Sequence, residues 1–209
     1  MLSEQQRAEF TKRGVIWLRG AFSSEDAARM RRRVWARLAR TGGVAEDDPA
    51  TWAAAQVTGI SKPSKRDAVF TAVGSAVVRG AVDDLLGRDQ WDPPREWGTI
   101  MVTFPDRSRP WALSAGGMHT DYGIRHGPEP LFGVKVFAFL SDVRPRGGGT
   151  VVITGSHRLM ARYAASVPPQ ARCGLPGDVL HRHAPNTGSY PRMMMTKNPY
   201  RRGNWPVYR

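Results

Sequence analysis

The chain contains a single cysteine and no long hydrophobic run. Cys173 has no partner for an internal disulfide, which suits a reducing compartment, and we therefore expect a cytoplasmic protein. No stretch approaches the roughly 20 consecutive apolar residues of a membrane-spanning helix, so we expect no membrane span. The first residues are polar rather than basic and then apolar, and they predict no secretory signal.

Acidic residues are also few, with 18 Asp and Glu against 31 Lys and Arg, which gives a formal net charge of +13. A basic balance can mark a surface that binds nucleic acid or an anionic membrane. The basic clusters are short, and the run Arg31 to Arg33 is predicted to be a solvated helix face without interleaved aromatic side chains. The charge suits an anionic small-molecule substrate better than nucleic acid, and oxidation of nucleic-acid bases is a minor alternative.

The order of the expected elements indicates one α+β domain, which fits a length of 209 residues. Capping residues and helically spaced apolar side chains predict helices over 3–13, from Ser23 or Ser24 to Gly42, over 75–86, and within 157–172. β-Branched and aromatic residues predict strands at 15–18, 99–104, 131–140 and 150–154, with further strands around His119, His181 and Met193. We expect a helical part over about residues 1–97 and an antiparallel barrel over about residues 98–200.

The segment from Gly117 to Gly123 contains the first residues of a possible metal site, His119 and Asp121. Residues two apart on a strand point to the same face, so this imidazole and carboxylate could converge on one ion. His181 adds a distal imidazole, and Arg192 follows eleven residues later. Two histidines and a carboxylate form the facial triad of non-haem Fe(II) oxygenases, and a guanidinium suits the carboxylate of a cosubstrate. The set therefore fits a 2-oxoglutarate-dependent oxygenase.

Further motifs occur in order along nearly the whole chain. They are residues 2–20, Phe139 to Val143, Gly148 to Thr150, Gly155 to Arg158, Pro176 to Asp178, and His181 to Arg192. Together they resemble the phytanoyl-CoA dioxygenase family of the Fe(II)/2-oxoglutarate-dependent oxygenase superfamily. The resemblance implies a double-stranded β-helix, a jelly-roll or cupin-like barrel, packed by N-terminal helices in one domain spanning residues 1–209.

The same resemblance implies a dioxygenase that hydroxylates a small molecule. His119, Asp121 and His181 would be its catalytic residues and the ligands of Fe(II). The keto acid end of 2-oxoglutarate would bind the metal beside dioxygen, and Arg192 would bind the far carboxylate. The family's halogenating relatives have a small residue at the position of Asp121, so the carboxylate points to hydroxylation. Residues 44–72 and 105–116 are expected to supply the lid and rim of the pocket.

Four assignments leave alternatives. His183 could share a strand face with His181, but the family pattern places the ligand five residues before the Asn of Ala-Pro-Asn, so we choose His181. Lys135 interrupts an apolar run; either it points inward and helps to hold 2-oxoglutarate or substrate, or it takes the outward position of an alternating strand. Thr150 is a hydroxyl candidate for binding the cosubstrate. His157 is expected to make structural hydrogen bonds rather than to bind metal.

The segment before the distal histidine is short. Only Val179 and Leu180 separate Asp178 from His181, and two residues at about 3.3 Å each cannot cross a barrel wall. An alternative reading is therefore a non-catalytic or impaired double-stranded β-helix protein.

Overall fold

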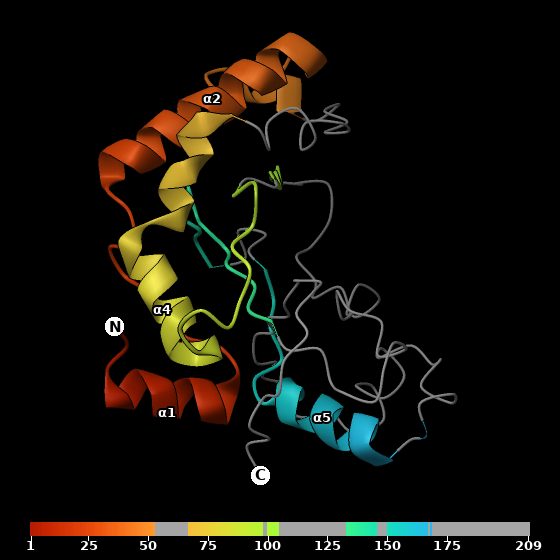
Figure 1. Ribbon diagram of the computed structural model, residues 1–209. Coiled ribbons are helices and arrows are strands. Elements are labelled where there is room, and N and C mark those ends of the chain that lie inside the picture. Colours follow the sequence, from red (N-terminus) through yellow and green to blue (C-terminus); the bar gives the residue numbers. More distant parts are fainter. Residues whose placement is uncertain (53–66, 98–99, 105–132, 146–149, 167, 169–209) are drawn as a thin grey trace.

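The computed structural model describes residues 1–52, 67–97, 100–104, 133–145, 150–166 and 168 (Figure 1). Its helices are α1 (Glu4–Arg13), α2 (Ser24–Gly42), the 3-10 helices η1 (Pro49–Trp52) and η2 (Ala68–Gly74), α4 (Ala76–Leu86) and α5 (Ser156–Ser166). Helices α1, α2 and α4 lie together on one side of the extended segments 100–104 and 133–145. In this part of the chain no helix has the length and apolar character needed to cross a membrane.

Helix α1 begins and ends at the residues that the sequence predicts. The Ser3 hydroxyl accepts a hydrogen bond from the Gln6 N–H at 3.2 Å, and the Gln6 side chain accepts one from the Ser3 N–H at 2.9 Å. This reciprocal pair is a capping box, which satisfies two N–H groups at the start of the helix. Gly14 ends the helix in the left-handed conformation, with φ of 73°.

Helix α2 buries one apolar stripe, as its helical spacing predicts. Met30 is 0% exposed, and Val34 and Leu38 are also buried. The Ser23 hydroxyl accepts a hydrogen bond from the Asp26 N–H at 3.0 Å, so Ser23 rather than Ser24 caps the helix. Gly43 ends it with φ of 64°.

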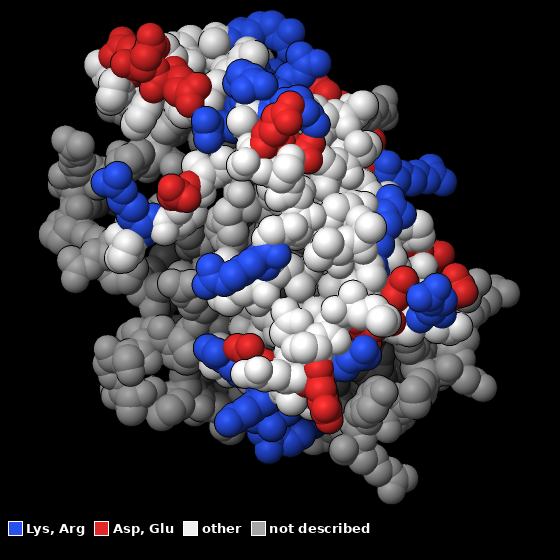
Figure 2. All heavy atoms as spheres, turned by 90° about the vertical axis from the view of Figure 1, so that its left-hand side faces the viewer, with Lys and Arg blue, Asp and Glu red and all other residues white. Residues whose placement is uncertain are grey.

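The arginines of α2 lie on its solvated side. Arg31 to Arg33 are all exposed, which confirms the prediction for this run. Arg33 forms an ion pair with Asp67, the residue that caps η2, and Arg31 lies 3.7 Å from Glu46. Figure 2 shows basic and acidic side chains interspersed over the face that α1, α2 and α4 form. Exposed pairs of this kind each contribute about 0–1 kcal/mol, so they tune the surface more than they hold the fold.

Helix α4 runs from the Ser75 cap to Gly87, as predicted, and α1 is attached to it. Leu2 is buried, and its N–H donates a hydrogen bond to the Asp84 carboxylate. Arg7 lies 3.2 Å from the other oxygen of the same carboxylate. Asp84 therefore holds the N-terminal end of α1 against α4.

The main core lies among α2, η2 and the extended segments. Helix η2 contacts both α2 and α4. The buried members of the core are Met30, Val34, Leu38, Val44, Phe70 and Val73. Val44 and Phe70 belong to the range 44–72 that was expected to form a lid, so the two ends of that range are core instead. The reason is that η2 packs its apolar side chains under α2 rather than presenting them to a pocket.

Gly74, at the end of η2, lets Trp97 approach the backbone closely. A Cβ added to Gly74 would lie 2.2 Å from the Trp97 ring. Arg79 covers the same ring at 5.3 Å from its centroid and donates a hydrogen bond from Nε to the Gly74 carbonyl at 2.7 Å. Glycine at this position is therefore a packing requirement.

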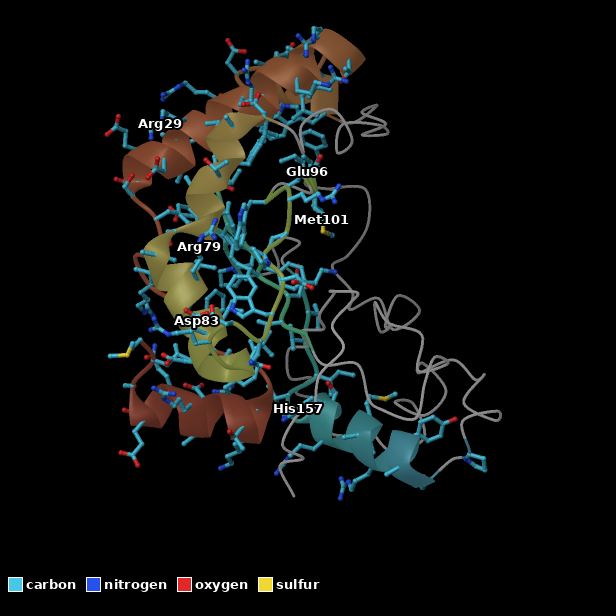
Figure 3. The ribbon with its side chains drawn as sticks, viewed as in Figure 1. Arg29, Arg79, Asp83, Glu96, Met101 and His157 are labelled. Atoms are coloured by element: carbon cyan, nitrogen blue, oxygen red, sulfur yellow. The ribbon has the colours of Figure 1, made fainter. Side chains whose placement is uncertain are left out.

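Alternate residues of two extended segments pack against the main core. They are Ile100, Val102 and Phe104 in one segment and Val136, Ala138 and Leu140 in the other. Met101, between Ile100 and Val102 in the sequence, is 75% exposed, and Figure 3 shows it on the side away from α2 and α4. This period of two is that of a β-strand.

No paired strand is present in the described parts of the four segments predicted as strands, 15–18, 99–104, 131–140 and 150–154. A strand needs a neighbouring backbone to complete its hydrogen bonds. The strands predicted around His119 and His181 lie outside the described residues. Of the four segments, 100–104 and 133–140 keep the alternation of apolar side chains that is typical of a strand.

Candidate functional site

Most of the predicted site lies outside the described residues. This holds for the three proposed metal ligands His119, Asp121 and His181, and also for His183 and Arg192. Within the ranges that the structure describes, no three His, Cys, Asp or Glu side chains converge as a metal site would require. Of the candidate site residues, the structure places Lys135 and Thr150.

Lys135 lies on the face of its segment opposite to the helices. Its neighbour Val136 packs against the main core, and the alternation continues with Ala138. The Lys135 ammonium lies 5.3 Å from the centroid of the Phe137 ring, which belongs to the same face as Lys135. A cation over an aromatic face is favourable by about 0.5–1 kcal/mol at exposed sites and by more when water is excluded. Lys135 is thus partly buried without being part of the helical core.

Phe139 continues the face on which Lys135 lies. Its ring centroid is 5.9 Å from that of Trp17, in the segment that follows α1. Both rings remain considerably exposed, so this contact leaves part of their apolar surface uncovered. The face therefore combines one ammonium with several aromatic rings.

Thr150 is exposed and belongs to a different packing unit. Two residues later, Val152 is buried in a second apolar cluster with Met160 of α5, and Val15 packs against this cluster. Lys135 and Thr150 are therefore positioned by two separate cores, the first under α2 and the second between α5 and the end of α1.

Three aromatic rings pack together, one of them inside the expected rim segment 44–72 and one directly before the other, 105–116. The centroids of Trp35, Trp52 and Phe104 are 5.7–6.1 Å apart. The Trp52 indole N–H donates a hydrogen bond to the Ala45 carbonyl at 2.7 Å. Trp52 directly precedes residues 53–66, and Phe104 directly precedes residue 105. Aromatic pairs contribute about 0.5–1.5 kcal/mol beyond their buried area, so these contacts help to hold Trp52 and Phe104 in place.

His157 connects the Gly-Ser-His-Arg motif to the end of α1. Its Nε2 lies 3.1 Å from the Thr11 carbonyl oxygen, and the Gly155 N–H donates a hydrogen bond to the Arg13 carbonyl at 2.8 Å. Carbonyls in the last turn of a helix lack partners within the helix, and these two are satisfied from the start of α5. The prediction that His157 makes structural hydrogen bonds is confirmed.

The sequence did not reveal how closely His157 approaches Gly14. A Cβ on Gly14 would lie 2.3 Å from Nδ1 of the imidazole. Nδ1 is buried and has no hydrogen-bond partner among the described residues. Burial lowers the pKa of His157 below its ordinary value, the Thr11 carbonyl opposes that shift, and repulsion by Arg158 adds to it. Gly14 predicted the end of a helix. No residue near it in the sequence indicated that it would contact His157.

Comparisons of the chain with protein-family models, with curated proteins and with solved structures give no match. The resemblance described above therefore rests on the quoted motifs, and a function has to be argued from the residues themselves.

Proposed function

We propose that the chain is an Fe(II)- and 2-oxoglutarate-dependent dioxygenase that hydroxylates a small molecule. The observation that carries this proposal is the ordered set His119, Asp121, His181 and Arg192. Two imidazoles and one carboxylate are the donor set of the facial triad, so the residues fit ferrous iron by their chemistry. The metal, when bound, would supply the activation of dioxygen.

The chain's own residues would bind and orient the organic partners. Arg192 would hold the far carboxylate of 2-oxoglutarate through two parallel hydrogen bonds, because its planar fork matches a carboxylate. The excess of basic residues would favour a substrate that carries a carboxylate or phosphate. Most of that excess belongs to segments outside the described ranges, and the C-terminal forty residues are rich in arginine.

The layering of the fold supports a role for Lys135. Helices cover one face of the segments 100–104 and 133–140, and in a double-stranded β-helix packed by N-terminal helices that face is the outside of the barrel. The opposite face would then line the interior. This placement favours the inward alternative for Lys135, in which its ammonium helps to bind 2-oxoglutarate or substrate beside Phe137. Thr150 remains a proposed hydroxyl contact for the cosubstrate.

The direct test is consumption of 2-oxoglutarate that depends on added ferrous iron. Under anaerobic conditions, addition of Fe(II) and 2-oxoglutarate to the full chain should produce a weak visible charge-transfer band. Arg192→Met should weaken the binding of 2-oxoglutarate while leaving metal binding intact, and Arg209→Met serves as a control with the same change of charge. A folded, iron-loaded protein that binds no 2-oxoglutarate would overturn the proposal.

The two-residue spacing between Asp178 and His181 favours one competing function, a β-helix protein that has lost catalysis. This alternative predicts a folded chain without the visible band and without turnover. The band therefore separates the two readings before any substrate is known.

A further inference from the structure

The C-terminal end of α1 is held by a titratable contact that plays no part in the proposed oxygenase chemistry. Figure 3 shows His157 between the end of α1 and the start of α5. The Thr11 carbonyl can only accept a hydrogen bond, so Nε2 of the imidazole carries the donated proton across 3.1 Å. Nδ1 is buried and faces Gly14, where no acceptor is available among the described residues. The contact therefore fits the neutral tautomer with its proton on Nε2.

A second proton on the imidazole would have to enter a mostly positive environment. The last turn of α1 carries Lys12 and Arg13, of which Arg13 is paired with Glu9 at 2.8 Å. The first turn of α5 carries Arg158, which disfavours a second positive charge beside it. The partial negative charge at the end of α1 acts in the opposite direction. Removal of the ring from water is the largest effect on the imidazole, and with the repulsion by Arg158 it outweighs the hydrogen bond to the Thr11 carbonyl and places the pKa of His157 below its ordinary value.

We propose that His157 is a pH-sensitive latch, which holds the end of α1 against the start of α5 when neutral and releases it when protonated. The sign follows from linkage. The pKa of His157 is lower when α1 is docked than when it is detached, so the detached form binds the proton more readily. Docking is therefore fully stable above about pH 6.5 and weakens as the pH falls toward the pKa of the docked form. Leu2 and Arg7 still attach the other end of α1 to Asp84, so the release is local to residues 10–16 and 150–160.

Amide hydrogen exchange of the full chain, measured by mass spectrometry between about pH 7.5 and pH 5.5 and corrected for intrinsic exchange, tests the latch. Peptides that contain residues 10–16 and 150–160 should lose protection by up to about tenfold per pH unit between the two pKa values, because one proton is coupled to opening. Peptides of α2 should keep their protection and serve as the internal reference. His157→Gln, whose amide can donate to the Thr11 carbonyl but cannot titrate, should abolish the pH dependence, whereas His126→Gln should retain it.

The latch would be overturned if these peptides lost as much protection on acidification in His157→Gln as in the unaltered chain. It would also be overturned if their protection in the unaltered chain did not change with pH. If His157→Gln does not fold, nuclear magnetic resonance of the imidazole in the unaltered chain decides the question. A His157 pKa below about 6.5 with the neutral proton on Nε2 supports the proposal, and a pKa at or above that value refutes it. Neither measurement needs iron, 2-oxoglutarate or substrate, so the latch and the oxygenase function can fail independently.

Discussion

Replacement of Gly14 by alanine should destabilise the protein more than the same replacement at Gly43. Both glycines end a helix with positive φ, 73° at Gly14 and 64° at Gly43. Alanine in this conformation costs about 1–2 kcal/mol because its Cβ crowds the following carbonyl oxygen. At Gly43 nothing lies within 4 Å of the added Cβ, whereas at Gly14 the added Cβ would lie 2.3 Å from the His157 ring.

The two positions therefore share a backbone penalty and differ in one contact. Alanine at Gly14 must displace the imidazole, which removes its hydrogen bond to the Thr11 carbonyl at a cost of about 0.5–1.5 kcal/mol. We expect a total loss of about 1.5–3.5 kcal/mol for Gly14→Ala and about 1–2 kcal/mol for Gly43→Ala.

Urea unfolding followed by far-ultraviolet circular dichroism gives the free energies of unfolding, at about pH 7.5 where His157 is neutral. A double-mutant cycle with His157→Ala isolates the contact, because Gly14→Ala should then cost no more than Gly43→Ala. If the two glycine replacements cost the same in the unaltered background, or if the excess at Gly14 persists without His157, the proposed contact does not exist.

Three further predictions follow from the packing and from the sequence. Met30→Ala should cost about 2–5 kcal/mol of unfolding free energy, while Met101→Ala should stay within about 0.5 kcal/mol; equal costs would contradict the placement of Met30 in the core and Met101 away from it. Gly74→Ala should cost about 1–3 kcal/mol and change the near-ultraviolet dichroism of tryptophan, because its Cβ would overlap Trp97; an unchanged spectrum and stability would argue against this close approach. His181→Ala should abolish iron-dependent consumption of 2-oxoglutarate, and His183→Ala should leave measurable activity; the reverse result would shift the strand by two residues and remove the assignment of Arg192 with it.

Features with a local physical cause could be predicted from the sequence. The Ser3 and Gln6 capping box, the glycines at positions 14 and 43, and the apolar stripe along α2 depend on residues within one or two helical turns, and the structure has all of them. The alternation of apolar residues in 100–104 is local in the same way. The metal-binding set was also proposed from local spacing, and it stays a prediction because its residues lie outside the described ranges.

The bounds of α1, α2 and α4 and the apolar side of α2 could thus be read from the sequence, because these properties follow from neighbours a few residues away. Which distant groups meet depends instead on how the elements pack. The Asp84 carboxylate accepts a hydrogen bond from the Leu2 N–H, and the Trp97 ring packs against Gly74. His157 forms a hydrogen bond with the Thr11 carbonyl at the end of α1. Such contacts depend on how whole helices pack, and many residues of the same type could supply them. A single sequence therefore indicates that a buried partner is needed without indicating which residue provides it.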